Sequence, residues 1–420
     1  MTASVPRPVP GRRPPRSNAG WSLVSLLLML LAGLVLVAAA LVLTKGSRKP
    51  ESPAPVAARL DTPLLDGKLS ANEGYVLALD ESGFLYGWGS ATNLDQPGAP
   101  QVFDRPTRGG SPQPWREIRA GTVATYALRG NGELWRIAPR QRLPNAKEDW
   151  DYANLAQSVE FPLFDSELRW RRALESWGVG AGIDTAGKLW YWVDKELRNP
   201  LKDTRPGPHG TPTQLGLGQT FIDLCSAGTR VYAIDQEGAL WGTGDLTGWR
   251  KGSGITHPAP DDGAFAEKLR PIEGASHLEK LFCTRSRVSV FALDRNGGLW
   301  EYGAKREERS GGGFVWHLTQ ANDQRWATLA LNTSQVFAIA TDGSLWQWDV
   351  FKPKPVLLDN QRRWVAVAAA NDAGAALSAD GQIYTWGGNH SGQLGDGSVA
   401  KQRDKPTPVF SAARFAKTAD

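Results

Sequence analysis

The chain has 420 residues, of which 41% are hydrophobic and 22% charged, and it contains 46 glycines, 28 prolines and 18 tryptophans. Turn formers combined with many large aromatic side chains favour short strands joined by tight turns, so the composition predicts an all-β protein. The net charge of +5 does not indicate a nucleic-acid-binding surface, because the first 51 residues hold seven basic side chains and one acid, which leaves the remainder close to neutral.

The N-terminal region predicts a membrane anchor. Residues 1–20 form a basic tail with four arginines and no acid, and residues 21–43 follow as 23 residues without a charge. As a helix this stretch is about 34 Å long, enough to cross a hydrocarbon core of roughly 30 Å. The alternative is a cleaved signal peptide, whose apolar region is usually about 7 to 15 residues long. We expect a single transmembrane helix that is retained.

The charges around this segment predict its orientation. The four arginines before it outweigh the three basic residues and Glu51 that follow it, which favours a cytoplasmic N-terminus by the positive-inside rule. The anchor is then expected in the inner or plasma membrane, with the rest of the chain in the periplasm or outside the cell. Residues 44–63 are rich in proline and alanine and are predicted to form a semi-extended linker.

Seven copies of one hairpin pattern follow the linker. Each copy has an apolar run, a short polar turn that closes on glycine, one variable residue and then an aliphatic and an aromatic residue, as in VYAIDQEGALWGTG from Val231. Glycine supplies the positive φ that a tight reversal requires. The seven turn glycines are Gly83, Gly132, Gly187, Gly238, Gly297, Gly343 and Gly381.

A bulky aromatic residue lies 17 positions before the turn glycine in five copies, although successive turn glycines are 38 to 59 residues apart. This constant spacing predicts a conserved three-strand unit, with length changes confined to one connection. Repeats of about 50 residues with several strands each favour a closed ring of blades. Residues 64–420 are therefore predicted to form a seven-bladed β-propeller. Phe415 matches the aromatic position that the first copy lacks, which predicts a closing C-terminal strand.

The last copy resembles a known repeat. Its sequence WGGNHSGQLGDG from Trp386, followed by KPTPV from Lys405, is similar to the repeat of the regulator-of-chromosome-condensation family, W-G-x-N-x-x-G-Q-L-G-x-G and then P-x-P. The resemblance implies a propeller with a protein-binding face. The family includes a nuclear guanine-nucleotide exchange factor, ubiquitin-ligase modules and a secreted bacterial β-lactamase inhibitor. The predicted membrane anchor makes this chain more similar to the bacterial members.

Motifs for catalysis or cofactor binding are weak. The five histidines show no H-E-x-x-H or paired i, i+4 spacing, and Gly182–Leu189 departs from a P-loop at Leu189, where a magnesium-binding Ser or Thr is required. We therefore assign no catalytic, cofactor-binding or metal-binding residue and expect no cofactor. A pair of hydrolytic carboxylates across the ring stays open as an alternative.

The two cysteines occupy nearly equivalent positions in adjacent repeats. Cys225 and Cys283 lie 13 and 14 residues before their turn glycines. In an exported domain this placement permits a disulfide between neighbouring blades, whereas in a reducing compartment the two residues would be buried thiols.

Two long connections depart from the repeat and predict where a partner binds. They are residues 136–169 and 242–277, and they carry Trp150, Tyr152, Trp249 and Arg250, aromatic and charged residues of the kind that anchor protein interfaces. The alternative is that these residues cover additional outer strands.

Together these features predict a membrane-anchored, non-catalytic scaffold that binds an unidentified protein of the cell envelope through loops of a rigid propeller face. No nucleic-acid partner is predicted. One alternative is an envelope glycan hydrolase or lyase with its site at the channel mouth. The other is a regulator or exchange factor for a GTPase, which requires the propeller to lie in the cytoplasm.

Overall fold

The structure is a computed structural model, and it describes most of residues 63–409 together with Phe415. The longer parts outside this description are residues 1–62, 90–102, 140–157, 194–211, 244–268, 285–289, 307–313, 410–414 and 416–420, and gaps of one to three residues occur elsewhere. The predicted membrane-spanning segment, residues 21–43, lies outside the described residues. No helix among the described residues is long and apolar enough to span a membrane.

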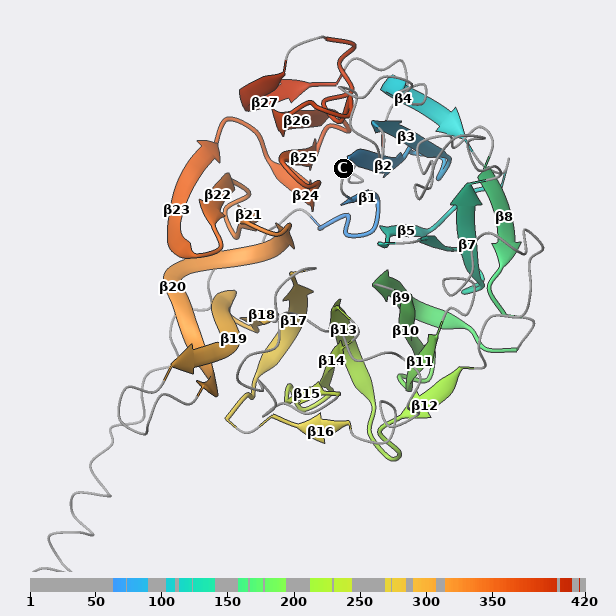
Figure 1. Ribbon diagram of the computed structural model, residues 1–420, viewed down its shortest axis with the longest axis vertical. Coiled ribbons are helices and arrows are strands. Elements are labelled where there is room, and N and C mark those ends of the chain that lie inside the picture. Colours follow the sequence, from blue (N-terminus) through green and yellow to red (C-terminus); the bar gives the residue numbers. More distant parts are fainter. Residues whose placement is uncertain are drawn as a thin grey trace, which may run out of the picture. The chain divides into compact units, whose positions relative to one another are not determined.

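The described residues form a ring of antiparallel blades around a central axis (Figure 1). The prediction of an all-β propeller is confirmed. The strands of the first four blades are β1 (Leu69–Asn72), β2 (Tyr75–Leu79), β3 (Leu85–Gly89) and β4 (Phe103–Gly109); β5 (Glu117–Ala120), β6 (Thr125–Leu128), β7 (Leu134–Pro139) and β8 (Ser158–Pro162); β9 (Trp170–Ser176), β10 (Val179–Asp184), β11 (Leu189–Val193) and β12 (Thr213–Leu215); and β13 (Phe221–Ala227), β14 (Arg230–Asp235), β15 (Leu240–Gly242) and β16 (Arg270–Pro271).

Blades five and six share a strand. The remaining strands are β17 (Leu278–Cys283), β18 (Val290–Asp294), β19 (Gly298–Arg306) and β20 (Phe314–Leu331); β21 (Gln335–Ala340), β22 (Leu345–Asp349) and β23 (Lys352–Asp359); and β24 (Trp364–Ala369), β25 (Ala373–Ser378), β26 (Ile383–Gly388) and β27 (Gln402–Pro408). The first part of β20 pairs with β19 as the outer strand of blade five, and from Trp326 onward it pairs with β21 as the inner strand of blade six. Each of the seven blades thus has four strands.

The turn between the second and third strand of each blade explains the recurring Asp and Gly. All seven turn glycines have a positive φ, between 75° and 86°. In blade four, Asp235 accepts a hydrogen bond from the Ala239 backbone N–H at 2.8 Å and from the Trp241 Nε1–H at 2.7 Å. Asp184 and Asp294 bind their own turns in the same way. The Asp and Trp side chains therefore fix the turn rather than forming a site.

The hydrophobic core lies between neighbouring blades. The aromatic residues 17 positions before the turn glycines are almost fully buried, and each packs in a cluster that unites two blades. In one such cluster Leu77 of blade one packs with Trp115 and Ile118 of blade two. Burying these large side chains between blades stabilises the ring by removing apolar surface from water.

Phe415, near the C-terminus, packs against blade one. It forms an isolated antiparallel bridge with Asp80, its side chain is 1% exposed, and its ring lies 5.7 Å from that of Tyr86. The aromatic residue Phe221 pairs with Asp235 in the same way in blade four. The residues on either side of Phe415 lie outside the description, so what is described of the predicted closing strand is this one bridge.

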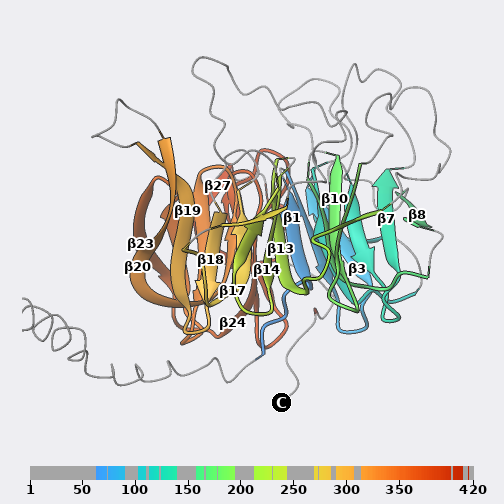
Figure 2. The same ribbon diagram turned by 90° about the horizontal axis from the view of Figure 1, so that it is seen from below.

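The strand order separates the propeller into two faces. Because neighbouring strands within each blade are antiparallel, the turn glycines lie on one face, here called the turn face, and the third strands end and the fourth strands begin on the opposite face, here called the connection face. The segment that leads into β1 lies at the lower edge in Figure 2. The variable spacing of the repeats falls between third and fourth strands, from Asp349 and Lys352 in blade six to Gly242 and Arg270 in blade four.

Candidate functional site

The inner strands enclose a central cavity of about 220 Å³. Its lining runs from the first residues of these strands, such as Arg172 and Lys280, to their last, such as Ser176 and Leu331. Six of the lining side chains are charged: Asp66, Arg119, Arg172, Glu175, Asp223 and Lys280. Three positive and three negative groups give the wall no net formal charge. Which charged groups can bind a ligand depends on which of them are already paired within the protein.

One position of the inner strands carries charges of alternating sign. In every blade this position, here called the ring position, pairs with the next-to-last residue of the second strand or with the residue equivalent to it. From blade one to blade seven it holds Lys68, Glu117, Arg172, Asp223, Lys280, Thr328 and Ala366. Opposite charges on neighbouring blades attract one another. The alternating charges at the ring position therefore stabilise the packing of blades one to five against one another.

Arg172 and Asp223 form the tightest ion pair of this ring. The Arg172 Nη1–H donates to Asp223 Oδ1, and Asp223 Oδ2 accepts a hydrogen bond of 2.8 Å from the backbone N–H of Leu281 in blade five. The Asp223 side chain is 4% exposed. The adjacent carboxylate of Asp223 raises the pKa of the Arg172 guanidinium, with burial acting in the opposite direction. This chain of contacts joins blades three, four and five.

Blade two contributes a second charged pair to the cavity. Arg119 Nε donates to Glu117 Oε1 at 2.7 Å, and the Arg119 side chain is 31% exposed. Burial lowers the pKa of Lys68 in blade one, and the negative charge of Glu117 partly offsets that effect. Glu117 therefore stabilises the positive charges of both Arg119 and Lys68.

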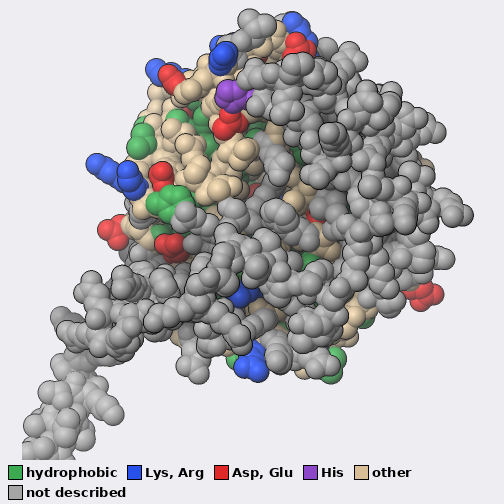
Figure 3. Space-filling model, in the orientation of Figure 1, with side chains coloured by type: hydrophobic (Ala, Val, Ile, Leu, Met, Phe, Trp, Pro, Cys, Tyr) green, Lys and Arg blue, Asp and Glu red, His purple; other side chains and the backbone are tan. Residues whose placement is uncertain are grey.

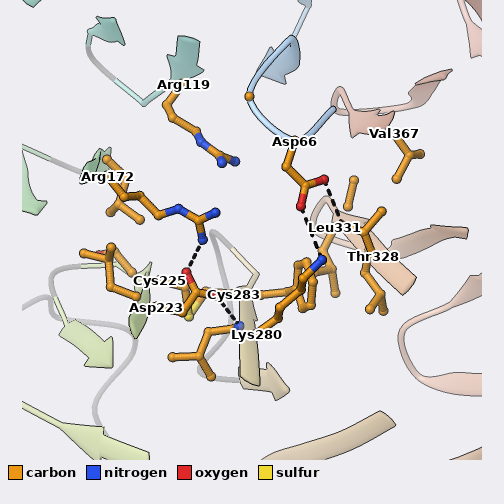
Figure 4. Close-up of a pocket in the computed structure, with 18 of the residues that line it drawn as sticks. Asp66, Arg119, Arg172, Asp223, Cys225, Lys280, Cys283, Thr328, Leu331 and Val367 are labelled. Atoms are coloured by element: carbon orange, nitrogen blue, oxygen red, sulfur yellow. Dashed lines mark hydrogen bonds and ion pairs between the residues drawn. A yellow bond between two sulfur atoms is a disulfide. The ribbon is translucent and has the colours of Figure 1, made fainter. Parts of the chain in front are cut away.

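Asp66 reaches across the ring from the segment that enters blade one. Its Oδ2 lies 3.5 Å from Lys280 Nζ in blade five, and its Oδ1 accepts a hydrogen bond of 3.3 Å from Thr328 in blade six (Figure 4). Backbone hydrogen bonds fix the same segment to blades seven and two, from Leu65 N–H to Val365 O and from Ile118 N–H to Gly67 O, both 2.9 Å. The entry segment thus closes one end of the cavity.

A disulfide forms part of the cavity wall. Cys225 in β13 and Cys283 at the end of β17 are bonded, with their Cα atoms 5.6 Å apart. The bond joins the inner strands of blades four and five beside the Asp223 contact. Of the two alternatives that the sequence left open for these cysteines, the structure contains the disulfide.

The residues selected from the sequence as partner-binding candidates are not placed by the structure. Trp150, Tyr152, Trp249 and Arg250 lie outside the described residues. Along the upper and left edges of the face in Figure 3, described basic side chains are interspersed with acidic ones.

Within the described part of the chain, neither a histidine nor the glycine-rich loop belongs to a cluster of metal-ligating side chains. The described residues contain no cluster of three metal-ligating side chains. His390 Nε2 lies 3.9 Å from Asp372 and is 53% exposed. In the same loop, Leu394 N–H donates to Asn389 Oδ1 and Thr385 Oγ1 donates to Leu394 O. This loop is built by its own internal hydrogen bonds.

The charged cavity was missed by sequence reasoning, although a signal for it exists. The ring position lies two residues after the buried aromatic residue, as in Trp170 and Arg172 or Phe221 and Asp223. Aligning the copies on that aromatic residue brings the alternating charges into one column. The contact from Asp66 has no such signal, because it depends on how the ring closes.

Comparisons with known proteins agree with this architecture. The family model described as the regulator of chromosome condensation (RCC1) repeat matches residues 380–419. The structure of Prp20p from Saccharomyces cerevisiae superposes with a TM-score of 0.56 at 14% identity, over 82% of this chain and 88% of that one. The last repeat of the chain thus matches the RCC1 repeat, and the chain shares the propeller fold of Prp20p. The resemblance seen in the last copy of the repeat is confirmed.

Two further structures share the fold. Yeast RCC1 (Prp20) bound to Kap60 gives a TM-score of 0.55 at 14% identity, over 87% of this chain and 90% of that one. Human WBSCR16 gives 0.54 at 12% identity, over 82% and 96%. Comparison with curated protein sequences gives no match. At these identities the structural similarity concerns the fold, and function has to be argued from this chain.

Proposed function

We propose that this RCC1-type propeller is a membrane-anchored, non-catalytic scaffold that binds a protein partner through its connection face. The observation that carries the proposal is the placement of length variation: the connections between third and fourth strands differ greatly, whereas the blades keep one plan. Variable loops on a rigid scaffold are where binding residues concentrate. The structures of Prp20p were described with its binding to Gsp1p and histones and with bound Kap60, so protein binding occurs on this fold.

The anchor and the location are parts of the same proposal. Residues 21–43 would hold the chain in the inner or plasma membrane with a cytoplasmic N-terminus, and the propeller would project into the periplasm or outside the cell. The bond between Cys225 and Cys283 supports this side of the membrane, because disulfides persist in oxidising compartments.

Crosslinking in intact membranes tests partner binding. The full-length chain is compared with a variant in which residues 140–157 and 244–268 are replaced by short Gly-Ser linkers, and the captured proteins are identified by mass spectrometry. A matched control shortens residues 194–211 instead. We expect a protein that is captured by the full chain and by the control but lost from the variant. Equal capture by all three would overturn the role of the two replaced connections.

Topology separates this proposal from its main rival. A reporter fused after Asp420 that is active only outside the cytoplasm supports the scaffold in the cell envelope. Activity only in the cytoplasm would instead favour regulation of a GTPase.

A further inference from the structure

Two arginines in the central cavity have donor groups that no described residue binds. Arg119 bonds to Glu117 through Nε, and Arg172 bonds to Asp223 through Nη1. A guanidinium carries five N–H groups in a planar fork. Among the residues that the structure describes, no partner binds the other N–H groups of either arginine, and each side chain is 31% exposed. These groups are therefore available to a ligand.

The two guanidinium groups enter the same cavity. Figure 4 shows Arg119 and Arg172 extending into it from neighbouring blades, and both side chains line it. Each cation is held in place by a largely buried acid, since the side chains of Glu117 and Asp223 are 13% and 4% exposed. The pair is thus fixed in position before any ligand arrives.

We propose that Arg119 and Arg172 form an anion-binding site that takes the carboxylate or phosphate group of a small ligand. Planar N–H forks match the oxygen spacing of both groups and bind them through paired, charge-assisted hydrogen bonds. This proposal does not rest on the proposed partner binding, so one can fail without the other.

The cavity restricts the ligand to a small molecule with one anionic end. Its volume of about 220 Å³ is below the range of roughly 300 to 1,000 Å³ of sites for drug-sized ligands. Asp66 and Glu175 also line the cavity, so a second negative group would be repelled. Lys280 does not compensate for that repulsion, because it is already engaged with Asp66 and with the backbone carbonyl of Ala327.

Calorimetric titration of the full-length protein in detergent tests the site. The probes are acetate and inorganic phosphate, with acetamide as an uncharged analogue of acetate. We expect saturable binding of at least one anion and none of acetamide. Arg119→Gln should weaken the binding roughly 10- to 100-fold, as expected for loss of hydrogen bonds to a charged group. Arg295→Gln is the matched control, because Arg295 is exposed in the turn of blade five, and it should bind as the wild type does.

Each result of the titration either supports the proposed anion site or overturns it. No saturable binding of either anion to the wild-type chain would overturn the proposal, as would anion binding that is unchanged in Arg119→Gln. Acetate alone binding identifies a carboxylate site, and phosphate alone identifies a phosphate site. If Arg119→Gln does not fold, as judged by circular dichroism, Arg119→Lys replaces it. That variant keeps the positive charge beside Glu117 but lacks the planar guanidinium group with its paired N–H donors. It should therefore also bind the anion more weakly than the wild type.

Discussion

The indole N–H of Trp88 donates a hydrogen bond of 3.0 Å to the backbone carbonyl of Gln393, 305 positions later in the chain. This contact joins blade seven to blade one. The backbone N–H of Gly397 adds a second link of 2.8 Å to Asp104 O in β4. The glycine-rich loop after β26, the best-preserved copy of the repeat motif, thus fastens the ends of the ring together. The sequence of this loop is therefore explained by its role in closing the ring of blades.

Gly395→Ala should destabilise the propeller by about 1 to 3 kcal/mol. A Cβ at this position would lie 2.5 Å from Trp88 Cδ1, and the backbone φ of +64° disfavours any side chain. Denaturant unfolding measures the loss. Gly130→Ala is the control, because nothing lies within 4 Å of a Cβ there, and it should change stability by less than about 0.5 kcal/mol. Equal effects at the two positions would mean that the closure contact contributes little.

Asp223→Ala should cost about 2 to 4 kcal/mol of unfolding free energy, because it leaves the Arg172 guanidinium and the Leu281 N–H without their buried acceptor. A double-mutant cycle with Arg172→Ala measures the coupling between the two side chains. Asp404→Asn, at an exposed position of β27, provides the control and should have a small effect. Additive single effects at residues 172 and 223 would show that the pair is not coupled.

The sequence predicted the repeat and the propeller because both depend on local patterns. A turn such as that at Gly238 needs a positive φ, so a glycine recurs in all seven copies, and an aromatic residue such as Phe221 needs a neighbouring blade to cover it and recurs in five. The cavity depends on side chains that meet across the ring. Arg119 and Asp66 lie outside the ring position, and their association with it follows only from the order in which the blades close.

Loss of the disulfide should lower stability by about 4 kcal/mol in the loop-entropy model, because the bond closes a loop of 58 residues. The measurement compares denaturant unfolding of the wild type with that of a variant carrying Cys225→Ala and Cys283→Ala. Reductant should shift the wild type toward the variant and leave the variant unchanged. Alkylation without reductant should add no mass to the folded protein purified from its native compartment. Two alkylated thiols in that sample would contradict the bond.

Alkaline pH should weaken the interface between blades four and five. The rings of Tyr232 and Tyr302 lie 6.4 Å apart, and burial raises the pKa of Tyr302 to about 12, with Tyr232 acting in the same direction. In the unfolded chain a tyrosine has a pKa of about 10. The folded state therefore holds this proton more tightly, so its stabilising contribution is complete below about pH 10 and is lost as the pH rises through about 12.

Denaturant unfolding across this pH range, followed together with phenolate absorbance, tests the effect. Tyr302→Phe removes the titrating hydroxyl and should make the free energy of unfolding fall less steeply between about pH 10 and 12. Tyr191→Phe, at a partly exposed position of β11, should retain the wild-type slope. If the wild type and Tyr302→Phe lose stability in parallel, another group governs the alkaline limit. A reduced slope in Tyr302→Phe alone would assign it to the contact between these two blades, which the disulfide also joins.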